Sequence, residues 1–162
     1  MNQHKMAILI RRAKISDAEG LAKLYLQFWE PHKVCDPLIE LKKELSCKNQ
    51  LDFARKDIKK KATNIFVAAE SNKVVGFIEV LIKKNDACFK INRYGYINAC
   101  VTDKDERGKG IAKMLTEHAL AFLKSKGIRF VRLNVYHINQ AAIAVWQKLG
   151  FKPQSMNLFK KL

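Results

Sequence analysis

A strand–helix–strand pattern in the second half of the chain constrains the fold most. Residues Arg93–Thr102 and Arg129–Val135 predict strands, and the second of these alternates strictly between its two faces. Between them, Gly110–Lys126 carries apolar residues at helical spacing, and Gly127 stands where helices commonly end. A connection through a helix joins strands that run in the same direction. The chain is therefore predicted to form a sheet with a parallel pair and a helix on its face.

The first half of the chain predicts antiparallel strands together with helices. Ala7–Lys14 is a strand candidate, and Ile65–Glu70 and Lys73–Lys84 form a hairpin around a Ser-Asn turn. Three helices are predicted between the first strand and the hairpin. They cover Ser16–Glu30, which Pro31 ends, then Pro37–Ser46, and finally Leu51–Lys61.

The C-terminal part predicts one further helix and one further strand, over Asn139–Leu149 and Asn157–Lys161. Together the segments predict an α/β fold in which one mixed sheet of about six strands is flanked by about four to five helices. The length of 162 residues is typical of one domain. Residues 1–162 are therefore expected to form a single domain.

Composition excludes several classes of protein. With 48% hydrophobic and 28% charged residues, the chain has the composition of a globular protein and not of a disordered tail. Its longest apolar runs, such as Ile65–Ala69, fall far short of the roughly 20 residues of a membrane span. The apolar run Met6–Ile10 is too short for the core of a signal peptide. We expect a cytoplasmic protein with no membrane partner.

Cysteines and histidines do not predict a metal site. No two cysteines form a Cys-x-x-Cys pair, and the histidines are scattered, so no zinc spacing is present. In a reducing compartment the thiols are expected to be free. The residues concerned are Cys35, Cys47, Cys88, Cys100, His4, His32, His118 and His137.

The net charge of +16 at pH 7 restricts the partners. The charge is spread along the chain, with more of it in the C-terminal part, and no separate basic tail is visible. Such a balance favours polyanionic partners, namely nucleic acid, an acidic membrane surface or a phosphorylated cofactor.

A basic, glycine-rich segment follows the strand Arg93–Thr102 and opens the next helix. It contains Arg107, Gly108, Lys109 and Gly110. Free backbone N–H groups and the helix dipole attract anions at a helix start, and glycine lets a ligand approach the backbone closely. The segment fits neither the dinucleotide fingerprint nor the nucleotide-phosphate loop. It predicts a phosphate site of another kind, with an ordinary basic turn as the alternative.

A second motif runs from Asn139 to Phe151. It reads Asn, two free positions, Ala142, three free positions, Trp146, then Lys148, Gly150 and Phe151 at fixed spacing. A core-facing helix that ends at a glycine explains the apolar positions. It does not explain why an asparagine opens the segment.

Together these two motifs resemble the GNAT superfamily of N-acetyltransferases. The family's acetyl-CoA loop reads Arg or Gln, two free positions, Gly, one free position, then Gly or Ala, which Arg107–Ala112 matches in full. The Asn139–Phe151 motif matches the helix after the fifth strand of the family, and Val74–Ile78 matches a weaker N-terminal pattern. The resemblance spans Ile8 to Leu162. It implies a GNAT fold whose fourth and fifth strands splay apart.

The resemblance also implies a binding site for acetyl-CoA, the co-substrate. The pyrophosphate is expected on the amides of the loop and the pantetheine arm beside the fourth strand, with the Asn139 helix on the other side. The residues implied are Cys100, Val101, Arg107, Gly108, Lys109, Gly110, Ile111, Ala112, Lys113, Asn139, Ala142 and Trp146.

The implied reaction is direct attack of an amine on the acetyl thioester. A backbone N–H of the fourth strand, near Cys100 or Val101, is expected to stabilise the oxyanion. Many relatives have a tyrosine acid at the aromatic position of the second motif, where this chain has Trp146. An indole N–H donates a hydrogen bond but is no useful acid. Tyr136 or water is expected to protonate the leaving thiolate.

No carboxylate occupies the fourth strand where many relatives carry a glutamate. Glu79 is the predicted general base, with Glu30 and Asp36 as alternatives, or with a purely structural role for each. Asn98, together with Tyr96, is expected to bind the acceptor or order a water molecule. We do not expect Cys100 to be a covalent nucleophile, because no histidine accompanies it.

The sequence therefore predicts an N-acetyltransferase acting on an amine, with a small-molecule primary amine as the favoured acceptor. One alternative is a catalytically weak GNAT protein that senses acetyl-CoA, suggested by Trp146. Another is a basic nucleic-acid-binding module, suggested by the bases and aromatic residues in Lys90–Ile97 and by the net charge. Nucleic acid is not the expected partner, and a homodimer is left open.

Overall fold

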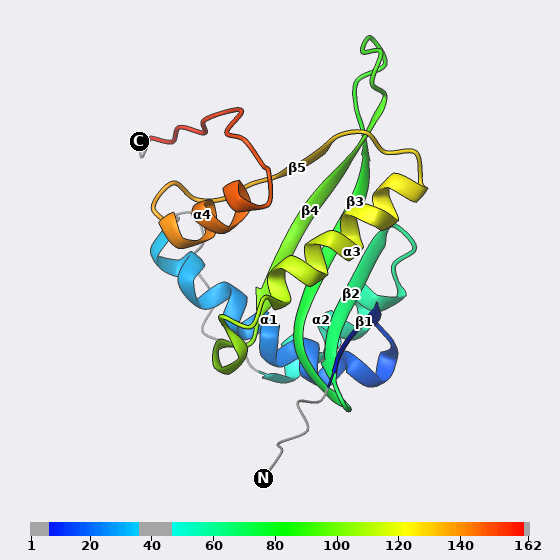
Figure 1. The fold of residues 1–162 in the computed structure, drawn as a ribbon, viewed down its shortest axis with the longest axis vertical. Helices are drawn as coiled ribbons and strands as arrows, with labels where there is room; N and C mark the ends of the chain where they lie inside the picture. The colour runs from blue at the N-terminus through cyan, green and yellow to red at the C-terminus, as the bar shows by residue number, and fades with distance from the viewer. Residues whose placement is uncertain (1–6, 36–46, 161–162) are drawn as a thin grey trace.

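The computed structural model describes residues 7–35 and 47–160, which form one sheet with helices on both faces (Figure 1). Five strands lie in the order β1-β2-β3-β4-β5. The first four pair antiparallel, and β4 pairs with β5 in parallel, as the strand–helix–strand pattern predicts. The strands are β1 (Ile8–Arg12), β2 (Thr63–Glu70), β3 (Lys73–Lys84), β4 (Arg93–Thr102) and β5 (Val131–Leu133).

Four α-helices occur within the described residues, and three of them cover the faces of this sheet. Two of them, α1 and α2, contribute to a core on one face of the sheet, and α3 forms a second core on the other face (Figure 1). The helix α4 lies beside β5 and buries none of its residues fully. The helices are α1 (Ala18–Cys35), α2 (Cys47–Lys59), α3 (Ile111–Ser125) and α4 (Gln140–Lys148).

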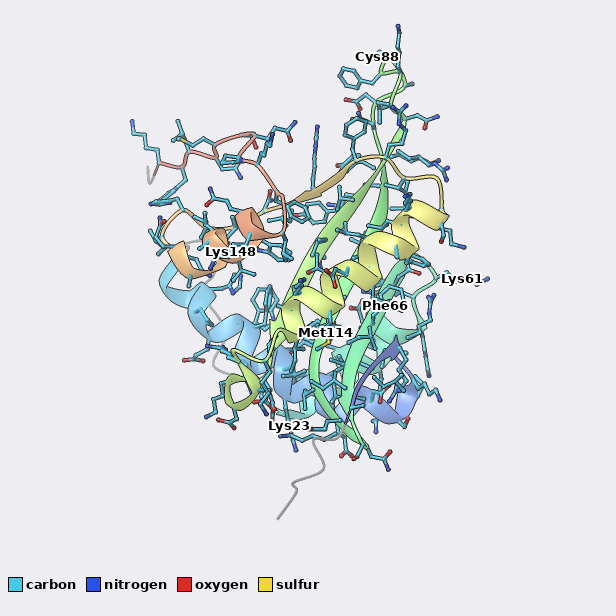
Figure 2. The ribbon with its side chains drawn as sticks, viewed as in Figure 1. Lys23, Lys61, Phe66, Cys88, Met114 and Lys148 are labelled. Atoms are coloured by element: carbon cyan, nitrogen blue, oxygen red, sulfur yellow. The ribbon has the colours of Figure 1, made fainter. Side chains whose placement is uncertain are left out.

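The two cores follow from the alternation of side chains along the central strands. Val67 and Phe77 point towards α1 and α2, whereas Ala68 and Ile78 point towards α3. Because both faces of β2 and β3 are covered, these strands read as nearly continuous apolar runs. In Figure 2, Phe66 lies on the α3 face, where its ring contacts His118 and Phe122.

The parallel pair is short, and this opens the edge of β4. Pairing between β4 and β5 begins at Gly95 and ends where Ile97 meets Leu133. Immediately beyond it, Asn98 is an extra residue between the β3 partners Glu79 and Val80, which is a β-bulge. The remainder of β4 pairs with β3 alone, so the two strands diverge as the resemblance implies.

The structure corrects several of the predicted boundaries. Pro31 lies inside α1 and does not end it. A proline this close to the C-terminus removes one hydrogen bond but leaves the last turn possible. That turn is supported by His32, whose ring contacts Tyr136 with centroids 5.4 Å apart. The helix predicted over Leu51–Lys61 begins four residues earlier and ends at Lys59.

At the C-terminal end, the prediction of a sixth strand is wrong over the residues that the structure describes. No strand occurs from Asn157 to Lys160, and Met156 and Leu158 are exposed. The fifth strand is also shorter than predicted, because only Val131–Leu133 finds a partner on β4. A strand-like sequence pattern does not guarantee that the segment finds a neighbouring strand with which to pair. The helix predicted over Pro37–Ser46 lies outside the described residues.

Candidate active site

The glycine-rich loop presents open backbone at the start of α3. Gly108 and Gly110 have φ angles of 81° and 77°, a region that favours glycine. Nothing lies within 4 Å of a Cβ built on either residue. The N–H of Met114 is bonded to the carbonyl of Gly110 at 3.1 Å, so the N–H groups before it lie in the unpaired first turn. A phosphate group fits this space and these donors.

The Glu106 side chain and a backbone hydrogen bond hold the loop in place. Glu106 forms an ion pair with Lys109 and a second with Lys73 at 3.6 Å, and the bond from Lys109 lowers the pKa of Glu106. The N–H of Asp103 donates to Val75 of β3 at 2.9 Å, which anchors the entry to the loop. Of the predicted phosphate ligands, Lys109 is therefore already paired. Arg107 has no carboxylate partner among the described residues.

The open edge of β4 begins at the bulge at Asn98 and continues to the end of the strand at Thr102, just before this loop. The carbonyl of Val101 lies against β3, at 2.9 Å from a Cβ built on Gly76. Since strand N–H and C=O groups alternate between the two edges, the N–H of Cys100 points the other way, to the edge that β5 has left. Of the two predicted oxyanion donors, only Cys100 has a backbone N–H free of the β3 ladder.

The thiol of Cys100 is on the α3 face and is not suited to nucleophilic attack. Burial raises its pKa to about 12, although a hydrogen bond with Thr116 opposes the shift. A thiol with such a pKa is protonated at neutral pH and unreactive. The expectation that Cys100 acts only through its backbone is compatible with this environment.

The second motif forms α4 and the turns on either side of it, which follow β5 in the chain. Asn139 is the N-cap of α4, and its side-chain oxygen accepts a bond from the N–H of Ala142 at 3.1 Å. This cap explains why an asparagine opens the motif. Trp146 packs edge-on against Phe151 with centroids 5.4 Å apart and is half-buried. Tyr136 lies between β5 and α4, where its ring contacts His32.

A buried polar cluster lies under the bulge of β4, on the face opposite α3. The hydroxyl of Tyr25 is 3.1 Å from Asp57 Oδ2 and 3.3 Å from Glu79 Oε2. Asn98, which is exposed, donates from Nδ2 to Glu79 Oε1 at 3.0 Å. Lys60, whose side chain is exposed at the surface, forms an ion pair with Asp57, with 2.9 Å between Nζ and Oδ1. Glu79 and Asp57 are only 5% and 2% exposed, so the two carboxyl groups share a nearly dry site.

This cluster is short of a proton when both carboxyl groups are ionised. The hydroxyl of Tyr25 has one hydrogen and two carboxylate oxygens within reach. Burial and, second to it, the charge of Asp57 raise the pKa of Glu79 to about 7. Burial and both carboxylates raise the pKa of Tyr25 well above its usual value, so the phenol keeps its proton. Glu79 therefore exchanges its proton near neutral pH.

Sequence reasoning identified Glu79 and Asn98 but missed Asp57 and Tyr25. Asp57 lies on the apolar face of α2, three residues after the buried Ala54. A carboxylate on an apolar helix face is a signal that pattern reading can detect. Of the alternative bases, Asp36 lies outside the described residues, and Glu30 is exposed on α1.

Within residues 7–35 and 47–160 no three His, Cys, Asp or Glu side chains are grouped as metal ligands would be. None of the helices there is both long enough and apolar enough to cross a membrane.

Comparisons with known proteins agree with this architecture. Residues 20–151 match the model of the acetyltransferase (GNAT) family. The chain is 33% identical over 86 residues to N-alpha-acetyltransferase 30 of Schizosaccharomyces pombe, covering 53% of this chain and 55% of that protein. It is 28% identical over 113 residues to human N-acetyltransferase 8, covering 70% and 49%. The chain thus spans about half the length of these curated relatives.

Solved structures share the whole fold. The structure of the aminoglycoside N-acetyltransferase AAC(6')-Iy in complex with CoA superimposes with a TM-score of 0.78 at 17% identity, covering 100% of this chain and 99% of that one. At this level of identity the likeness shows the fold alone.

Proposed function

Because this chain belongs to the acetyltransferase (GNAT) family, we propose that it transfers an acetyl group from acetyl-CoA to the primary amine of a small molecule. The observation that carries the proposal is the open glycine loop at the start of α3, next to the unpaired edge of β4. One element accepts phosphates and the other accepts an amide-bearing arm.

The residues that would hold acetyl-CoA come from three elements. Loop amides from Arg107 to Lys113 meet the pyrophosphate, and the edge of β4 at Cys100 and Val101 meets the pantetheine arm. Asn139, Ala142 and Trp146 of the α4 region close the other side. Acetyl-CoA supplies an acyl thioester, which an amine attacks without a covalent enzyme intermediate.

In the proposed step, the neutral amine forms a C–N bond with the acetyl carbon, and the C–S bond then breaks. The N–H of Cys100 donates to the developing oxyanion, since its direction suits that task. Glu79 receives the amine proton, through a water molecule held beside Asn98. A pKa of about 7 suits this role, because the carboxylate and its acid are both populated at neutral pH.

The thiolate leaves with a proton from Tyr136 or from water. Trp146 can position the thioester by packing, but its indole N–H does not supply that proton. A catalytically weak sensor of acetyl-CoA is the second candidate function, and Trp146 is the observation that favours it. Release of free thiol in the presence of an amine separates the enzyme from the sensor.

Titration calorimetry with acetyl-CoA tests the co-substrate site. We expect Gly110→Asp to abolish binding, because a carboxylate would face the pyrophosphate. Gly127→Asp is the matched control: Gly127 also has a positive φ, 74°, with open space around it, but it follows the far end of α3. Equal affinity in both variants, each shown to be folded, would contradict the loop assignment.

A further inference from the structure

Beyond the bulge, one face of the sheet carries aromatic rings and cations. A Cβ on Gly95 would meet Leu123 of α3 at 2.7 Å, so Gly95 faces α3. By alternation, its neighbours Tyr94 and Tyr96 face the opposite side. Arg132 of β5 faces that side too, because Val131 packs into the α3 core.

The contacts confirm that these side chains form one surface. The ammonium of Lys83 on β3 lies 3.6 Å from the ring centroid of Tyr96, and the guanidinium of Arg132 lies 5.0 Å from that of Tyr94. We call these four residues the tyrosine–cation platform. Within the described residues, neither Lys83 nor Arg132 forms an ion pair with a carboxylate. Among the described residues, the platform therefore presents two cations that stack on aromatic rings and pair with no carboxylate.

The platform is continuous with the candidate active site. Asn98 lies two residues beyond Tyr96 on β4, and its amide contacts Glu79 on the same face of the sheet. Two residues of a strand span roughly 6.6 Å. Tyr96 thus lies roughly 7 Å along β4 from Asn98, and Lys83, four residues from Glu79, lies roughly 13 Å from it along β3.

We propose that the tyrosine–cation platform binds the body of the acceptor, and that the acceptor is an amine carrying an anionic group, a carboxylate or a phosphate, at its far end. This inference rests on the proposed function and names its substrate class. A guanidinium and an ammonium next to one another favour an anion and repel a second ammonium. The platform thus selects against diamines and other polycations.

Thiol release with matched amines tests the selection. Hexylamine, 6-aminohexanoate, 6-aminohexyl phosphate and 1,6-diaminohexane share one chain and one reacting amine and differ in the far end. We expect kcat/KM to rise about fivefold or more from hexylamine to either anionic amine and to fall for the diamine. The two anionic amines distinguish carboxylate from phosphate. Equal kcat/KM for all four amines would overturn the proposal.

Variants locate the effect. In Arg132→Gln and Lys83→Gln the preference for the anionic amine over hexylamine should fall towards one. Lys84→Gln is the control, because Lys84 is the next residue on β3, is exposed and points to the other face. A preference that survives both platform variants, or that Lys84→Gln removes, would show that the anion binds elsewhere.

A binding measurement separates this inference from the proposed function. The side-chain Nε–Hε resonance of Arg132, assigned by its loss in Arg132→Gln, is followed by NMR as 6-aminohexanoate is added to the CoA-bound protein. A shift of this resonance without any turnover would support anion binding by the platform and contradict the proposed acetyl transfer. Turnover of hexylamine, with no shift of the resonance and no preference for the anionic amines, would support the proposed acetyl transfer and contradict anion binding by the platform.

Discussion

At the scale of single residues, the buried pair of carboxyl groups is the most consequential feature. Glu79 and Asp57 approach the same hydroxyl of Tyr25 although both are almost fully buried. Burying two like charges costs free energy unless one of them is neutralised by a proton. A site of this kind is expensive for stability and suited to proton transfer. In the proposed reaction Asp57 would be a positioning residue, because it would act on the substrate only through Glu79.

Replacement of Asp57 by asparagine should change the pH dependence of the reaction. Loss of the neighbouring charge lowers the pKa of Glu79, so the acid limb of the kcat/KM profile should move to lower pH. Asp52→Asn is the control, because Asp52 lies on the same helix but is exposed. An acid limb that stays in place in Asp57→Asn would mean that Glu79 is not the titrating base.

Glu79 should also make the protein less stable as the pH rises. Its folded-state pKa of about 7 exceeds the usual pKa of 4.5, so the folded state binds more protons between these values. The free energy of unfolding should therefore fall across this range, by roughly 3 kcal/mol at most. In Glu79→Gln this loss should disappear. Urea unfolding of both proteins at pH 5 and pH 8 measures it, with Glu70→Gln as a control at a less buried glutamate on β2.

At the scale of elements, close approach of α3 to the sheet sets the position of the glycine-rich loop. A Cβ on Gly76 of β3 would lie 2.9 Å from both Ile111 Cγ2 and the carbonyl of Val101. Ile111 is the first residue of α3, and Val101 lies on the open strand. The absence of a side chain at Gly76 thus lets the loop, β3 and β4 meet.

Replacement of Gly76 by alanine should move the loop and weaken acetyl-CoA binding. The added methyl group meets backbone as well as a side chain, so we expect a loss of about 1–3 kcal/mol in unfolding free energy. Gly95→Ala serves as the comparison, because there the methyl group first meets the δ carbons at the end of the Leu123 side chain and not backbone. Gly95→Ala should cost less and leave acetyl-CoA affinity closer to that of the wild type. The reverse order would contradict this role of Gly76.

At the scale of the whole molecule, the net charge of +16 creates a positive field that attracts anions. Local groups offset part of it, since Glu106 neutralises Lys109 in the loop itself. Much of the field therefore comes from charges outside the loop. This arrangement should accelerate encounter with acetyl-CoA more than it strengthens the bound complex.

Stopped-flow measurements of association test this role of the field. We expect the association rate constant for acetyl-CoA to fall steeply between about 0.02 M and about 0.5 M salt, because screening shortens the range of the field. Dephospho-CoA carries less charge and should show a shallower dependence. Identical slopes for the two compounds would indicate that the field does not steer the ligand.

Local features of the chain could be predicted from sequence because they depend on neighbours along it. β4 has the predicted bounds, and Gly110 and Gly127 stand at the two ends of α3 as expected. Positive φ, capping and strand alternation are decided by a few adjacent residues. Pro31 shows the limit of such rules, because tertiary contact through His32 supports a turn that a proline disfavours.

The sequence by itself determined the glycine loop, the α3 helix and the family, since their chemistry lies in contiguous residues. Only the tertiary structure brought Asp57 to Glu79 and Lys83 to Tyr96. Tyr25 and Glu79 are 54 positions apart in the chain, and their contact depends on how α1, α2 and β3 pack. Contacts between residues so far apart in the chain arise because the apolar faces of the elements pack together. This packing decides where polar side chains meet, and the pattern of any one segment does not reveal it.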